Sequence, residues 1–187
     1  MKTQLIVGGG ALLVGLLAGW MIRGVATYNT HTAAVATYED WRVACPMAET
    51  KDAHCELSTD VVDRSTGTPN PVARAGIAIN KEGKQTLNFM LPHGVALEAG
   101  MGLRLGKDPV KVYQYRTCNS VGCLAETPLD AALTTALNNA DDASLMFAGL
   151  DGKPVSTPMS FKGYKAALSA WKSADQKRGS WFWRLWS

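Results

Sequence analysis

The sequence lacks the short motifs that mark the common catalytic and cofactor sites. It contains no Gly-x-Ser-x-Gly, His-Glu-x-x-His or Cys-x-x-Cys pattern, which excludes a serine-hydrolase elbow, a zinc-protease helix and a thioredoxin-type dithiol. Gly100 and Gly102 are not followed by the third glycine of a dinucleotide-binding turn. The histidines are scattered along the chain as His31, His54 and His93. We therefore expect no enzyme activity, no cofactor and no small-molecule ligand.

Strong charge of one sign is also missing. The formal net charge is only +3 for 187 residues, which gives no indication of a nucleic-acid partner. The charge is uneven, however, because from residue 160 onward six lysines and arginines accompany a single acid, Asp175. The C-terminal part is therefore the basic part of the chain.

One long apolar run stands out against this polar background. Residues 5–22 contain no charged side chain, and as a helix they would extend about 27 Å, close to the ~30 Å hydrocarbon core of a bilayer. A secretory signal has a shorter apolar core, of about 7 to 15 residues. We therefore predict a retained transmembrane anchor over residues 1–23. Cleavage stays open, because residues 24–26 and 34–36 have small side chains at the right offsets.

The predicted anchor carries two further signals. Ala11, Gly15 and Gly19 recur every four residues, and such a stripe of small residues allows transmembrane helices to pack closely. Lys2 and the α-amino group precede the span and Arg23 follows it. The positive-inside rule then places the N-terminus in the cytoplasm and the rest of the chain on the other side of the membrane.

The remainder fits one domain with a mainly β fold. Residues 24–37 are small and polar and are expected to form a linker, followed by a domain over residues 38–179. Short extended segments separated by turns predict an antiparallel sandwich or barrel-like sheet. The expected strands are residues 37–45, 54–62, 72–80, 85–91, 94–100, 102–106, 110–118, 122–126, 143–150 and 153–159.

Two short α-helices are expected near the end of the domain. Thr127 can cap the first, Pro128 suits its first position, and Asp130 favours its N-terminal dipole. The second is expected after Ser160. Its apolar residues Phe161, Tyr164, Leu168 and Trp171 recur at helical spacing.

Four cysteines lie beyond the export-type segment, which is the context in which disulfides form. Their spacing indicates two local bridges, Cys45–Cys55 and Cys118–Cys123, although the other pairings remain possible. A metal site is the rival interpretation, since His54 precedes Cys55. Zinc sites show cysteine pairs two to four residues apart, and neither spacing here matches. We therefore expect no metal.

Several stretches resemble the invasion-associated locus B family. They are residues 40–45, Cys55, residues 91–95, residues 118–123, and residues 160–168 as the closing helix, and they occur in the family's order. The resemblance covers about residues 37–171. It implies an exported, β-rich, disulfide-bonded bacterial protein from a family named for a role in host-cell invasion. It does not imply an enzyme. The apolar anchor and the aromatic C-terminus fall outside the family pattern.

The chain ends in an aromatic tail, residues 180–187. Large apolar rings exposed to water cost about 25 cal/mol per Å², so we expect the tail to be buried, either on its own domain, at the bilayer interface or on a membrane protein. With the anchor it would hold the domain flat against the membrane. Its expected contact residues are Trp181, Phe182, Trp183, Arg184 and Trp186.

These features predict a non-catalytic interaction protein anchored in the bacterial inner membrane by one span, with its domain in the periplasm. Its expected partners are the membrane and an integral membrane protein complex, to which it would belong as an accessory subunit. The alternative is a secreted or surface-exposed invasion factor released by signal cleavage.

Overall fold

A computed structural model describes residues 34–47, 53–64 and 68–179 of the chain. The predicted anchor, with Ala11, Gly15 and Gly19, and the aromatic tail lie outside these residues. Among the residues that are described, no helix combines the length and the apolar character that crossing a membrane requires.

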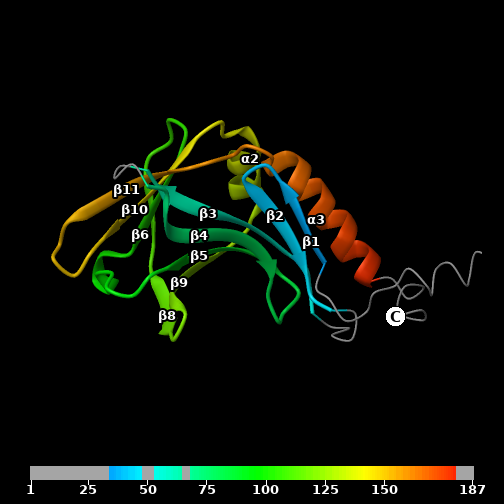
Figure 1. Cartoon of the computed structure of the whole chain (residues 1–187), viewed down its shortest axis with the longest axis horizontal. Coiled ribbons are helices and arrows are strands. Elements are labelled where there is room, and N and C mark those ends of the chain that lie inside the picture. Colours follow the sequence, from blue (N-terminus) through cyan, green and yellow to red (C-terminus); the bar gives the residue numbers. More distant parts are fainter. Residues whose placement is uncertain (1–33, 48–52, 65–67, 180–187) are drawn as a thin grey trace, which may run out of the picture.

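The described residues form two antiparallel sheets (Figure 1). The larger has seven strands in the order β1-β2-β3-β4-β5-β9-β8, and the smaller has four in the order β11-β10-β6-β7. The strands of the larger sheet are β1 (Ala34–Tyr38), β2 (Trp41–Cys45), β3 (Glu56–Asp63), β4 (Asn70–Ile79), β5 (Gln85–Leu91), β8 (Tyr115–Asn119) and β9 (Gly122–Pro128). Those of the smaller are β6 (Met101–Leu105), β7 (Lys111–Tyr113), β10 (Ala143–Ala148) and β11 (Pro154–Met159).

Two α-helices and one 3-10 turn complete the described part of the domain. They are η1 (Leu97–Ala99), α2 (Ala131–Asn139) and α3 (Tyr164–Gly179). Helix α3 runs along β1, β2 and β3 (Figure 1). The prediction of a mainly antiparallel β fold with two helices is confirmed.

One core joins both sheets and both α-helices. Alternate residues of β3 point into it, namely Leu57, Thr59 and Val61, and the neighbouring strands β4 and β5 do the same. This alternation follows from the two-residue period of a strand. The largest fully buried side chains include Trp41 of β2 and Trp171 of α3, so the aromatic residues join helix to sheet.

The N-terminal part of the domain differs from the sequence prediction. The stretch 37–45 is two strands rather than one, because the chain turns at Glu39 and Asp40 and β1 pairs back on β2 with Tyr38 opposite Trp41. Residues 34–37, expected in a linker, belong to β1. Glu39 has φ of 53°, a conformation normally taken by glycine or asparagine, so the sequence carries no turn signal here.

Three other predictions were wrong in detail. Residues 94–100 form η1 and an isolated bridge from Val95 rather than a strand. The stretch 110–118 divides at Gln114 into β7 and β8, which lie in different sheets. Helix α2 is capped by Asp130, whose Oδ1 accepts a hydrogen bond from the Leu133 amide at 2.7 Å, and not by Thr127, since residues 127–128 end β9.

Three side chains of α3 bind the loop closed by Cys45 and Cys55. Trp171 Nε1 donates to the Cys55 carbonyl at 2.8 Å. Asp175 accepts from the Cys55 amide at 3.0 Å, and its carboxylate lies 3.1 Å from His54 Nδ1. Arg178 donates to three carbonyls of the loop, those of Pro46, Met47 and Ala53. Spacings of four and three residues place the three side chains on one face of the helix.

These contacts define one end of the domain, which we call the Cys45–Cys55 end. It holds the start of β1 (Ala34 is the partner of Cys45), the bridge itself, and the end of α3. The turn between β4 and β5, residues 80–84, also lies there, because Leu57 at the start of β3 pairs with Ile77 near the end of β4. Both ends of the described chain therefore leave the domain at one place.

At its other end, α3 begins next to the β1–β2 turn. A Cβ atom added to Gly163 would lie 2.0 Å from the Tyr38 carbonyl oxygen, and Gly163 has φ of 80°. We expect Gly163→Ala to lower the free energy of unfolding by about 3 kcal/mol or more, since backbone strain and a clash with backbone add. The matched control is Gly152→Ala, where φ is 73° but nothing lies within 4 Å, at a cost of about 1 kcal/mol. Urea unfolding of the detergent-solubilised chain measures the free energy of unfolding of both variants. Equal losses in the two variants would refute the close approach of Gly163 to the Tyr38 carbonyl.

Tyr164 is almost fully buried against Trp41, with ring centroids 4.9 Å apart. Burial raises its pKa from 10.0 to about 12. The unfolded tyrosine ionises near pH 10.0, whereas the folded one keeps its proton to about pH 12. The stabilising contribution is therefore complete below pH 10 and is lost as the pH rises towards 12, by about 2–3 kcal/mol. Unfolding from pH 9 to 11.5 should show this decline in the wild type and a shallower one in Tyr164→Phe. Identical declines would contradict the prediction.

Candidate functional site

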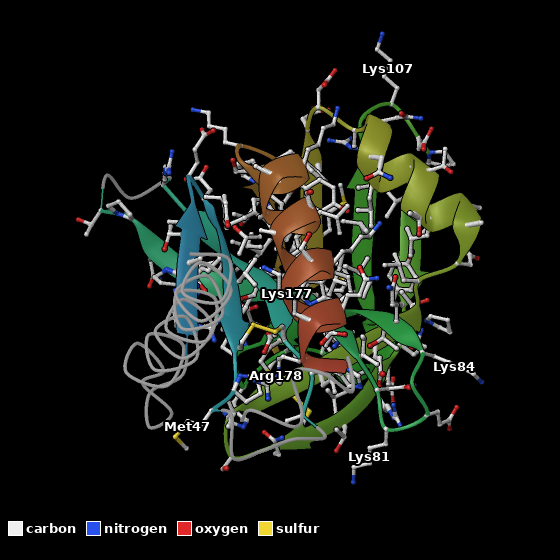
Figure 2. The ribbon with its side chains drawn as sticks, turned by 90° about the vertical axis from the view of Figure 1, so that its right-hand side faces the viewer. Met47, Lys81, Lys84, Lys107, Lys177 and Arg178 are labelled. Atoms are coloured by element: carbon white, nitrogen blue, oxygen red, sulfur yellow. A yellow bond between two sulfur atoms is a disulfide. The ribbon has the colours of Figure 1, made fainter. Side chains whose placement is uncertain are left out.

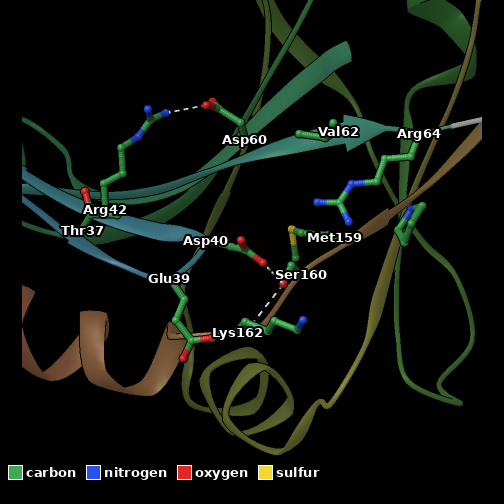
Figure 3. A pocket seen from close by; sticks show the side chains of 11 residues that line it. Thr37, Glu39, Asp40, Arg42, Asp60, Val62, Arg64, Met159, Ser160 and Lys162 are labelled. Carbon is green, nitrogen blue, oxygen red and sulfur yellow. Dashed lines mark hydrogen bonds and ion pairs between the residues drawn. The ribbon is translucent and has the colours of Figure 1, made fainter. Parts of the chain in front are cut away.

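A cavity lies where the β1–β2 turn meets the end of β3 and the β11–α3 junction. Its volume is about 490 Å³, and it is open on one side. Figure 3 shows side chains from all three elements converging on it. It is lined by Thr37, Glu39, Asp40, Arg42, Asp60, Val62, Arg64, Pro158, Met159, Ser160 and Lys162.

The β1–β2 turn is held in place by hydrogen bonds to Ser160. Asp40 Oδ2 accepts from the Ser160 hydroxyl at 2.5 Å, and Trp41 Nε1 donates to the Ser160 carbonyl at 2.9 Å. The Asp40 carbonyl accepts from Thr59 Oγ1 at 2.7 Å. The left-handed conformation of Glu39 persists because these bonds fix the residues that follow it. This wall of the cavity is therefore preorganised.

A row of charges crosses the outer face of the sheet beside the cavity. Asp60 of β3 accepts from Arg42 of β2 at 2.7 Å and from Arg74 of β4 at 3.0 Å. About a third of the Arg42 and Asp60 side chains and half of Arg74 are exposed. Exposed pairs of this kind contribute little to stability. They fix the direction of the side chains that a partner would meet.

The side-chain charges of Arg64 and Lys162, two cations of the cavity, form no ion pair with another described residue, although the Lys162 amide donates to the Ser160 hydroxyl at 3.2 Å. The guanidinium of Arg64 points across the cavity mouth in Figure 3. Glu39 adds an acid to the rim, and Val62, Pro158 and Met159 supply apolar surface. Mixed charge around a small apolar patch is the character of a rim of a protein–protein contact rather than of a site for one anion.

Among the described strands, β3 has no partner on its β2 side at residues 60–62, beside this cavity. Its pairing with β2 stops at Thr59 opposite Trp41, whereas its pairing with β4 continues to Asp63. Unpaired strand edges accept extended peptide segments. The arrangement can therefore hold a segment of another chain.

The chemistry of the cavity does not resemble a hydrolase triad. The Ser160 hydroxyl donates to the carboxylate of Asp40 instead of to an imidazole. The two described histidines lie elsewhere: His54 contacts Asp175, and His93 Nε2 is 2.7 Å from the Asn119 carbonyl. The described residues contain no cluster of His, Cys, Asp and Glu that could hold a metal ion.

The structure contains both disulfides that the spacing indicated. Cys45–Cys55 joins the end of β2 to the residue before β3, and Cys118–Cys123 joins β8 to β9 across their turn. No described cysteine is free. Each bridge closes a hairpin, and the two lie in different parts of the larger sheet. The other predicted site residues, in the anchor and in the tail, lie outside the described residues.

Sequence reasoning did not find the cavity. Asp40 and Ser160 stand 120 residues apart, and neither belongs to a catalytic motif. Both lie in stretches that carry the family resemblance, which was the one available signal. Lys162 lies in the same stretch as Ser160, whereas Arg64 had no such signal, because a single basic residue at the end of a strand is an ordinary surface residue.

Comparison with known proteins gives the same family as the sequence. The family model described as "Invasion associated locus B (IalB) protein" matches residues 41–172, which is most of the chain. The chain belongs to the invasion associated locus B family. Among solved structures it is similar to invasion associated protein B from Bartonella henselae, with a TM-score of 0.61, 18% identity, and coverage of 76% of this chain and 99% of that one. At this identity the match shows the fold alone. Comparison with curated proteins gives no match.

The Asp40–Ser160 contact can be measured by a double-mutant cycle. We expect Asp40→Asn and Ser160→Ala each to lower the free energy of unfolding by about 1–2 kcal/mol, and the double variant to cost less than the sum, because both changes remove one charge-assisted hydrogen bond. Arg104→Ala with Ser144→Ala is the matched control, since that exposed pair is 3.4 Å apart and should give no coupling. Strict additivity at Asp40 and Ser160 would argue against the bond.

Proposed function

We propose that this chain is a non-catalytic interaction protein of the periplasm, anchored in the inner membrane by residues 1–23 and acting as an accessory subunit of a membrane protein complex. The observation that carries the proposal is that the chain enters and leaves the domain at one end. Ala34 pairs with Cys45, and Arg178, next to the last described residue, bonds to Pro46. A span before this end and an aromatic tail after it would act on the same side of the domain.

The disulfides support the proposed periplasmic location of the domain. Both close hairpins, and all four cysteines of the chain take part in them. Structural disulfides persist in oxidising compartments such as the periplasm. The positive-inside rule gives the same side for the domain. The two arguments are independent, because one uses sulfur chemistry and the other the charges that flank the span.

The features of the cavity favour a binding site for a protein segment over a catalytic site. The cavity offers the edge of β3 at residues 60–62, a rim of mixed charge and a small apolar patch, and its serine donates to a carboxylate. Such a surface suits a protein segment. The partner would be a chain of the complex that extends into the periplasm.

The family description favours a second candidate, an invasion factor released into the medium or onto the cell surface. That function requires removal of residues 1–23, whereas the first requires their retention. A released factor would have no need of a second membrane-directed segment, which the tail supplies on our proposal.

The state of the native N-terminus tests the two candidates against each other. We expect the chain to remain in the membrane pellet after carbonate washing, because an 18-residue apolar span inserts firmly, and N-terminal sequencing to find Met1 or Lys2. Replacing residues 8–10 by three aspartates should release the domain, while the same replacement at residues 107–109, in a surface loop, should not. A mature chain beginning near Thr27, or recovered from the soluble fraction, would favour the released factor.

A further inference from the structure

We propose that the cavity binds an extended segment of a partner protein, which adds as a short strand to β3 at residues 60–62 and brings one acidic side chain to Arg64. The inference rests on the interaction role in the proposed function. It deepens that role, because it names the backbone groups, the charge and the kind of segment involved.

The first argument is the direction of the backbone groups of β3. The β1–β2 hairpin has a two-residue turn, with Tyr38 opposite Trp41, and the residues that flank such a turn exchange hydrogen bonds with each other. The backbone groups of Trp41 therefore face β1, and those of Thr59, its partner in β3, face β4. Because these directions alternate along a strand, the backbone groups of Asp60 and Val62 face the side on which β2 has already ended.

The strand on the other side of the cavity is β11, which lies next to β3 in the fold. Among the described strands β11 pairs with β10 alone. Its residue Pro158 lines the cavity and has no amide hydrogen, as is typical of an edge strand that takes no further partner. An added strand would therefore find its hydrogen-bonding groups on β3 and not on β11.

The two walls of the cavity are held together before any partner arrives. Ser160 follows β11, and it forms hydrogen bonds with Asp40 and Trp41 at the β1–β2 turn. Figure 3 shows the bond between the Asp40 and Ser160 side chains. A preorganised site loses little conformational entropy when it binds. The edge of β3 is therefore presented in one fixed arrangement.

The surface next to this edge is apolar. Val62, Pro158 and Met159 line it, and Met159 is almost fully buried. Covering such a surface with an aliphatic side chain is favourable, at about 25 cal/mol per Å². Since β-branched residues also suit an extended backbone, we expect valine, isoleucine or threonine in the segment.

The lining residues carry three acids and three bases, so the cavity as a whole does not attract anions. The charges differ in what they already bind. Asp60 accepts from Arg42, and Asp40 accepts from a serine hydroxyl. The guanidinium of Arg64, directly after the end of β3, forms no ion pair with a described residue and points across the cavity mouth (Figure 3). A single carboxylate beside the pairing residues of the segment is its complement.

Two further charges limit the segment to one acid. Lys162 and Glu39 both line the cavity, and neither side chain forms an ion pair with a described residue. Lys162 adds attraction for the carboxylate that meets Arg64, whereas Glu39 repels a second carboxylate. We therefore expect one acid among apolar residues and not a run of acids.

Peptide selection tests the proposal. A phage library of random heptapeptides is panned on the full chain in detergent micelles, and the enriched peptides are synthesised with a fluorescent label. We expect them to share one acidic residue among β-branched and aliphatic residues. Fluorescence anisotropy then gives the Kd. Arg64→Gln should weaken binding about tenfold, as expected for the loss of a hydrogen bond between charged groups, and Lys162→Gln should weaken it less.

Two basic residues outside the cavity supply matched controls. Arg104 lies on β6, and Lys107 extends into solvent away from the body of the domain (Figure 2). Arg104→Gln and Lys107→Gln should leave the Kd unchanged, and urea unfolding shows whether each variant is folded. Equal affinities of Arg64→Gln and Arg104→Gln, enriched peptides without an acid, or no enrichment over empty micelles would overturn the proposal.

A scan with N-methylated peptides tests the strand pairing itself. Pairing along one edge uses every second amide of an added strand, so N-methylation should weaken binding at alternate positions. A scan without alternation would overturn the proposal. The result does not depend on the membrane anchor. A soluble chain that binds these peptides would refute the anchoring alone, whereas a membrane-retained chain that binds none would refute this site alone.

Discussion

The contact between α3 and the Cys45–Cys55 loop is the constraint on which the arrangement of this domain depends. Three side chains on one helical face form hydrogen bonds with backbone groups of the loop. They are Trp171, Asp175 and Arg178. Buried backbone groups without partners are costly, and the described residues of the loop, 46–47 and 53–55, lie outside the strands. The helix supplies those partners. In doing so it fixes the place where the chain leaves the domain relative to the place where it enters.

The opposite end of α3 is fixed by a different kind of contact. Gly163 passes so close to the Tyr38 carbonyl that no side chain fits, and Ser160 binds both Asp40 and Trp41. The β1–β2 hairpin is thus bound to the helix at both of its ends. The cavity is a product of this attachment, because the hairpin turns back while β3 continues past it.

The local features of this fold could be predicted from sequence, and the long-range ones could not. Strands such as residues 85–91 and the two disulfides follow from alternation and from cysteine spacing, which act between near neighbours. The β1–β2 turn was missed because Glu39 takes a conformation usually reserved for glycine. The division at Gln114 was missed because the alternating pattern continues while the chain passes from one sheet to the other. The cavity joins residues up to 120 apart, and no local pattern carries that information.

The short range of the disulfides has a consequence for how the chain folds under oxidising conditions. The bridges span 10 and 5 residues, so in the unfolded chain each cysteine lies nearest in sequence to its native partner. Loop closure is least costly over short separations, which favours the native one of the three possible connectivities. The bonds from α3 to the loop span 116 residues or more, so the first bridge can close before the helix that will hold its loop has packed.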